Sequence, residues 1–295
     1  MEKVALLVVY NHRFDRNIPI VEKIYKDRFN NIFHIVPFYD GNKENVIPVY
    51  ENSYYFQGYI AQAYTHLVGK GFTHFFVIAD DLILNPKVNE ENLWDELGIA
   101  KDDNLLPDLK ILQTYGYWRQ IPRALRYNPS PKGVEIGKVL PIREKAIEIF
   151  KERGIPTTKI EISSLISHKN LKEFAKSIYH FPFKFSLPYP LVGGYADIFL
   201  VTNDIMRKFC NYCGAFAATN LFVEIAIPTA LQLATNKIKY ITDGKLKNGA
   251  LWTDSEKNGF NSKYSFNFKN LMDNFPKDKL YIHPVKLSKW DTSSL

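Results

Sequence analysis

The sequence has little of what marks several common classes of protein. Its 295 residues include only two cysteines, Cys210 and Cys213, so it is not a disulfide scaffold. This lone C-x-x-C lacks the second ligand pair of a structural zinc site and does not follow a strand, as a redox motif should. We therefore expect two thiols that lie in the core or at a helix end.

Several signature motifs are missing as well. The chain has no G-x-x-x-x-G-K-S/T and no G-x-G-x-x-G, which disfavours P-loop chemistry and a standard dinucleotide fold. Neither G-x-S-x-G nor H-E-x-x-H occurs. No stretch approaches 18 apolar residues, and the apolar run over 4–10 is too short for a secretory signal and lacks a cleavage site. We expect a cytoplasmic protein; peripheral binding to a membrane stays open.

The composition is that of a folded protein with a basic surface. Hydrophobic residues make up 46% of the chain, enough for a substantial core, and the length suits one large α/β domain. The net charge of +7 favours anionic partners. The basic residues are dispersed, however, so we do not expect nucleic acid to bind.

Strand and helix patterns alternate at the start. Apolar runs predict strands over 4–10, 32–39 and 71–79, and helical spacing predicts helices over 18–29 and 53–70. This β-α-β-α-β order predicts parallel strands with right-handed crossovers, and thus a doubly wound, Rossmann-like α/β sheet with helices on both faces.

The pattern is less regular over 87–190, which we interpret as an insert over the sheet. After it come a glycine pair, a strand over 195–201 and helices that begin near 203 and 219. The elements expected within the insert are a strand over 109–115, an aromatic loop with Tyr115, Tyr117 and Trp118, helices near 141–153 and 169–179, and an extended loop over 187–190.

Two adjacent carboxylates, Asp80 and Asp81, end the third predicted strand. Burial of unpaired carboxylates is costly, so both should lie where the strand leaves the core, which is the ligand-binding edge of an open α/β sheet. Two acidic groups there suit a hard divalent cation, Mg²⁺ or Mn²⁺. The alternative is that they cap a turn or a short helix, where Asp is common.

Four features stand in a fixed order along the chain. They are Asp80-Asp81 after a strand, Gly193-Gly194 before a strand, Glu224 in an apolar helix, and a late His283. Together with the opening β-α-β-α-β pattern, they resemble a bacterial GT-A-fold glycosyltransferase over most of 1–86 and 190–290.

The acidic motif departs from the Asp-x-Asp of that family. The triplet Ala79-Asp80-Asp81 lacks the leading Asp but keeps the last carboxylate, which contacts metal in the family. The resemblance therefore implies Asp81 as the metal ligand, with the share of Asp80 open. His283 matches a late His that contacts metal or phosphate; without the resemblance, it is an ordinary histidine at a strand edge.

The resemblance implies a nucleotide-sugar donor, with UDP favoured and GDP or CMP open. Its diphosphate would be bound through Mn²⁺ or Mg²⁺, with Lys286 adding a positive charge. Four residues that follow the first two strands are placed to meet the base or ribose: Tyr10, His12, Arg13 and Asp40.

On the acceptor side, Glu224 matches the acidic position that supplies the general base of inverting members; a solvated helix residue is the alternative. Gly193 and Gly194 would let backbone lie against a sugar, and Asp197 would accept a bond from a sugar hydroxyl. Trp118, its aromatic neighbours and the stretch 179–189 would stack on acceptor rings, or are ordinary packing.

The resemblance as a whole implies one GT-A-like domain over 1–295, with a nucleotide-binding half over 1–86 and an acceptor and catalytic half over 191–295. The expected enzyme is an inverting hexosyltransferase that builds a bacterial surface polysaccharide or lipopolysaccharide on a glycan or lipid-linked acceptor. Two rivals stay open. One is a sugar nucleotidyltransferase, disfavoured because the loop over 11–15 has no glycine, and the other is a non-catalytic carbohydrate-binding protein on the same fold.

Overall fold

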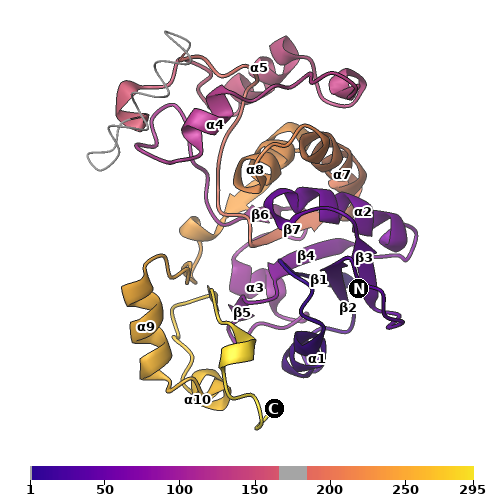
Figure 1. Ribbon diagram of the computed structural model, residues 1–295, viewed down its shortest axis with the longest axis vertical. Helices are drawn as coiled ribbons and strands as arrows, with labels where there is room; N and C mark the ends of the chain where they lie inside the picture. The colour runs from indigo at the N-terminus through magenta and orange to yellow at the C-terminus, as the bar shows by residue number, and fades with distance from the viewer. Residues whose placement is uncertain (1, 166–184) are drawn as a thin grey trace.

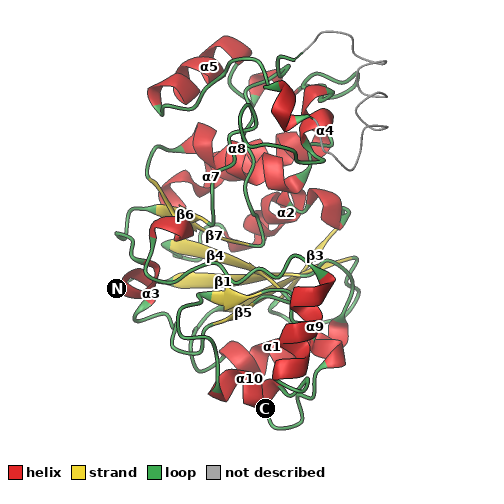
Figure 2. Ribbon diagram, turned by 90° about the vertical axis from the view of Figure 1, so that its left-hand side faces the viewer, coloured by secondary structure: helices red, strands yellow, loops and turns green. Residues whose placement is uncertain are grey.

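The computed structural model describes residues 2–165 and 185–295. A seven-stranded sheet lies between two layers of helices (Figure 1 and Figure 2). The strands, in their spatial order, are β3 (Val46–Val49), β2 (Ile32–Pro37), β1 (Val4–Val9), β4 (His74–Ala79), β7 (Ile198–Thr202), β6 (Asn104–Leu106) and β8 (Ile238–Tyr240).

The sheet is parallel except at β7. That strand runs antiparallel to both β4 and β6, whereas the remaining neighbours pair in parallel. The expected α/β architecture with helices on both faces is thus confirmed, and so are the parallel strands β1, β2 and β4 of the opening pattern. The chain enters β7 at the edge where β4 and β6 end, so it needs no crossover and runs back in the opposite direction.

Helices cover the two faces of the sheet in separate layers. One layer holds α2 (Gln57–Leu67), α7 (Asn203–Ala218) and α8 (Val223–Ala234), with α4 (Ile121–Leu125) and α5 (Arg143–Glu152) beyond it. The other face carries α1 (Ile18–Tyr25), α9 (Asp254–Lys263) and α10 (Phe268–Asp273), and α3 (Leu93–Leu97) packs on the same side. A small sheet joins β5 (Ile83–Leu84) to β9 (Tyr281–Ile282).

The central strands are buried from end to end because each has apolar residues on both faces. In β1, Ala5, Leu7 and Val9 belong to the core under α2, α7 and α8, and the alternate residues belong to the core under α1. This two-sided burial explains the unbroken apolar runs in the sequence. Both cysteines lie in α7 as free, buried thiols, as expected.

Most of the expected elements are present. The expected helices near 141–153 and from 203 correspond to α5 and α7, while the helix expected from 219 begins at Val223. In the expected helix over 53–70, a 3-10 turn that is capped by Asn52 precedes α2. The helix expected near 169–179 lies outside the described residues.

The strand expected over 109–115 is wrong. The strand is β6, five residues earlier, and residues 112–114 form a turn. Because β6 pairs with β7 and β8, the stretch interpreted as an insert contributes a strand to the central sheet. The part of the chain after β8 also holds α9, α10 and β9, which the periodicity of the sequence did not indicate. Over the described ranges, none of the helices combines the length and apolarity needed to cross a bilayer.

Alanine at Gly249 and alanine at Gly259 should have opposite effects on the stability of the fold. A Cβ at Gly249 would overlap the Tyr281 carbonyl group, whereas one at Gly259, inside α9, would meet no atom within 4 Å. We expect Gly249→Ala to destabilise the fold by about 1–3 kcal/mol or more. Gly259→Ala should stabilise it by about 0.5–1 kcal/mol. Urea unfolding curves of both variants measure the two effects, and equal midpoints would contradict this packing of β9.

Candidate functional site

A pocket of about 170 Å³ opens at the edge where β1 and β4 end. Its walls come from the loop after β1, the end of β4 and the C-terminal segment, three parts of the chain that are distant in sequence. The lining includes four residues that were expected at the donor site, His12, Asp80, Asp81 and Lys286. The edge on which they meet is the ligand-binding edge of open α/β sheets.

Asp80 is the buried member of the acidic pair. Its exposed fraction is only 5%, and burial together with the charge of Asp81 raises its pKa to about 7. Hydrogen bonds from the Asn17 side chain and the Asn11 backbone act to lower the pKa of Asp80. Since like charges repel, a cation or a proton between the two carboxylates would relieve the strain of holding them together.

Asp81 is tied to the C-terminal segment. Its Oδ1 lies 2.9 Å from His283 Nε2, and its carbonyl accepts a hydrogen bond from Val285 N–H at 2.7 Å. Burial lowers the pKa of His283, but the hydrogen bond and charge of Asp81, with the charges of Asp197 and Asp80, raise it overall. The surrounding carboxylates thus stabilise the protonated form of the imidazole.

Tyr195 fixes the other side of that imidazole. Its hydroxyl lies 2.5 Å from His283 Nδ1, its ring stacks on Tyr281, and its backbone N–H donates to Asp108 Oδ1 at 2.6 Å. Asp197 Oδ2 lies 4.0 Å from the same imidazole nitrogen, and burial raises the pKa of Asp197. Tyr195 and Asp108 were not expected in the site, although Tyr195 directly follows the glycine pair.

Glu224 lies in the first turn of α8, at the same edge of the sheet. Its carbonyl accepts a hydrogen bond from Gly194 N–H at 2.9 Å, which joins α8 to the segment before β7. Burial raises the pKa of the Glu224 carboxyl to about 7. The charges of Lys110 and Arg119 act to lower this pKa, and those of Asp197 and Asp108 act to raise it. Glu224 therefore changes charge near neutral pH.

Lys110 is the residue that sequence reasoning missed most clearly. It is 6% exposed, and its ammonium lies 4.8 Å from the ring centre of Trp118, 5.5 Å from Tyr115 and 5.8 Å from Trp252. Over the described ranges it makes no side-chain hydrogen bond or ion pair. A sequence signal existed, because Lys110 stands between the apolar Leu109 and Ile111, shortly before aromatic residues.

The glycine pair packs against the protein itself. A Cβ at Gly193 would lie 2.6 Å from Trp118 Cζ3, and one at Gly194 would lie 2.7 Å from the Asp108 carbonyl oxygen. Neither has positive φ. The need for glycine at both positions is therefore explained by internal contacts, which bring Trp118 over the site.

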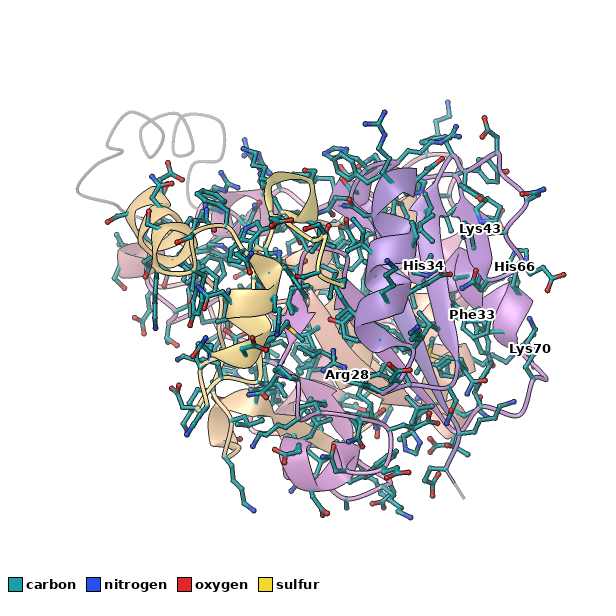
Figure 3. All side chains as sticks on the ribbon, turned by 90° about the horizontal axis from the view of Figure 1, so that it is seen from below. Arg28, Phe33, His34, Lys43, His66 and Lys70 are labelled. Atoms are coloured by element: carbon teal, nitrogen blue, oxygen red, sulfur yellow. The ribbon has the colours of Figure 1, made fainter. Side chains whose placement is uncertain are left out.

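Three expected donor residues point elsewhere. Tyr10 is fully buried, and its hydroxyl lies 3.0 Å from Nδ1 of His34, a buried residue beside α1 (Figure 3). Arg13 and Asp40 are exposed and pair with each other, and that pairing lowers the pKa of Asp40. The charges of Arg13 and Asp40 are thus already paired, and none of the three residues lines the pocket.

Comparisons with known proteins give no family. No model of a protein family matches the chain, and no curated protein matches its sequence. The function must be argued from the geometry.

The acidic pair fits a hard cation only in part. Asp81 Oδ1 is buried and meets only the His283 imidazole, and Asp80 stands next to it. Within residues 2–165 and 185–295, however, no three His, Cys, Asp or Glu side chains are arranged to hold a metal ion. A cation here would take further oxygens from its ligand and from water, as Mg²⁺ usually does in phosphate sites.

The electrostatics of Glu224 give a direct prediction. Lys110→Met removes the largest charge that lowers its pKa while keeping a long apolar side chain, so the pKa of Glu224 should rise above about 7. Arg119→Gln should raise it less. Carboxyl ¹³C NMR titrations of the two variants measure the shifts; no rise with Lys110→Met would show that Lys110 does not act on Glu224.

Proposed function

We propose that the protein is a metal-dependent GT-A-type glycosyltransferase. It transfers a sugar from a nucleotide donor, UDP favoured, to a glycan or lipid-linked acceptor. The observation that carries the proposal is that Asp80, Asp81 and Lys286 line one pocket, with His283 bound to Asp81. A role in bacterial surface polysaccharide or lipopolysaccharide synthesis rests on the family resemblance alone.

The pocket suits the diphosphate of such a donor. Its volume of about 170 Å³ is below the roughly 300–1,000 Å³ of pockets that hold whole cofactors, so base and sugar would extend beyond it. Asp81, with Asp80, would hold Mn²⁺ or Mg²⁺. Such an ion, when bound, neutralises charge on the departing diphosphate. Lys286 supplies positive charge from the protein itself, as does His283 when it is protonated.

Glu224 is placed to act as the general base. It takes the proton of an acceptor hydroxyl as that oxygen bonds to the sugar carbon and the diphosphate leaves with its bonding electrons. A pKa of about 7 allows both proton uptake and release near neutral pH. This arrangement favours inversion at the sugar carbon.

The donor assignment predicts metal-dependent nucleotide binding. Heated with UDP, GDP or CMP, the protein should show a raised unfolding midpoint with one nucleotide, and only when Mn²⁺ is present. At 100 times the Kd, the added stability is about 2.7 kcal/mol.

Asp81→Asn should abolish that nucleotide shift. The matched control is Asp278→Asn, an exposed carboxylate outside the pocket, which should keep the shift. A shift that survives Asp81→Asn would overturn the metal assignment. The complete absence of shifts in the wild type would favour the non-catalytic carbohydrate-binding protein, and production of a sugar nucleotide from a nucleoside triphosphate would favour the nucleotidyltransferase.

Glu224 predicts the pH dependence of transfer. The base must be ionised, so kcat/KM should fall about ten-fold per pH unit below a midpoint near 7 and level off above it. Glu224→Gln should lower kcat by about 10²–10⁴-fold and remove this limb, whereas the exposed Glu91→Gln should leave both unchanged. A Glu224→Gln enzyme with the wild-type profile would contradict this role.

A further inference from the structure

A second, larger pocket lies on the helical layer that contains α8. Its volume is about 770 Å³, and it opens between the turn before α2, helix α4 and the α7–α8 connection. Arg123 and Arg126 contribute to its lining, and no Asp or Glu does. None of the sequence expectations fell on it.

Its arginines belong to a row with unbalanced charge. Arg119 precedes α4, Arg123 lies in it and Arg126 caps its C-terminus, at spacings of four and three residues, and all three are exposed. Among the described residues, none of them forms an ion pair. Arg123 instead donates to the neutral Tyr54 hydroxyl and to Gln120 Oε1. The guanidinium groups therefore remain available to an anion, which they bind in bidentate geometry.

The rest of the lining suits a sugar. Tyr54 is 39% exposed, and its ring centre lies 4.7 Å from that of Phe222, so the two form one aromatic wall. Asn128 and Asn220 add side-chain amides, which both donate and accept hydrogen bonds, as sugar hydroxyls require. The Asn52 amide is bonded to Tyr54 N–H and to Glu51. A pocket for an inorganic anion alone would need neither the width nor the aromatic wall.

The pocket adjoins the residue assigned as the base. Phe222 and Ile225 line it, and Glu224, which lies between them in the sequence, belongs to the same first turn of α8. Arg119, at the start of the arginine row, acts on the charge of Glu224.

We propose that this pocket binds an anionic saccharide, with the carboxylate or phosphate on Arg123 and Arg126 and a sugar ring against Tyr54 and Phe222. Its description as the acceptor site rests on the proposed transferase function. The proposal that the pocket binds a saccharide does not depend on that function.

Calorimetry with matched probes tests the proposal. The probes are trigalacturonate with its neutral methyl ester, and mannose 6-phosphate with mannose, at an ionic strength of 0.15 M, so that long-range attraction is screened. We expect at least one anionic probe to bind ten-fold or more tightly than its neutral counterpart. Whichever probe binds names the anion as carboxylate or phosphate.

Three single variants locate the binding. Arg123→Gln and Arg126→Gln should each weaken it roughly ten-fold or more, because each removes charged hydrogen bonds. Arg207→Gln removes an equally exposed charge from α7 that lines a different groove, and it should have no effect. All three side chains are at the surface, so the unfolding midpoints should not change.

Three results would overturn the proposal: equal binding of charged and neutral probes, no binding of either anion, or an equal loss with Arg207→Gln. The nucleotide shift, measured on the same samples, separates the two proposals. If UDP with Mn²⁺ shifts the midpoint but no anionic probe binds, the pocket assignment fails and the transferase stands. If an anion binds through Arg123 while no nucleotide does, the transferase fails and the pocket stands.

Discussion

The contact between Asp81 and His283 joins the first third of the chain to its last residues. Because β5 continues from the acidic pair and pairs with β9, the imidazole lies beside Asp81, and Val285 N–H bonds to the Asp81 carbonyl. Removing one partner of a largely buried ion pair leaves the other uncompensated. The small sheet and the pocket therefore depend on this contact, as does the position of Tyr195, whose hydroxyl meets the same imidazole.

The edge of the sheet carries several carboxylates at short range, at the expense of stability. Burial and mutual repulsion raise the pKa of Asp80, and burial, with the Asp81 charge, also raises that of Asp197 although His283 opposes it. A protein without a use for such a cluster would gain stability from neutral residues there, and clusters of this kind are concentrated at functional sites. Lys110 adds a buried cation beneath the ring of Trp118.

Two binding regions follow from this layout. The smaller pocket, between the ends of β1 and β4 and the C-terminal segment, is acidic inside with basic residues at its walls. The larger one, between α2, α4 and α8, has arginines and no acidic residue. Glu224 lies in the turn of α8 that lines the larger pocket and within electrostatic range of Asp197, whose carboxyl is 4.0 Å from His283. Under the two proposals, the smaller pocket would hold the diphosphate and the larger one the saccharide.

The sequence by itself determined the opening strands and helices and the acidic pair at the end of β4. These features are local, because apolar runs report two-sided burial and the charges that follow such a run mark the end of the strand, although Asp80 itself stays buried. Only the tertiary structure decided the antiparallel β7, the position of β6, the pairing of Asp81 with His283, and the burial of Tyr10 away from the pocket. It also decided that Lys110 and Arg119 lie near Glu224. Each of these depends on contacts between distant segments, and no local periodicity encodes which segments meet.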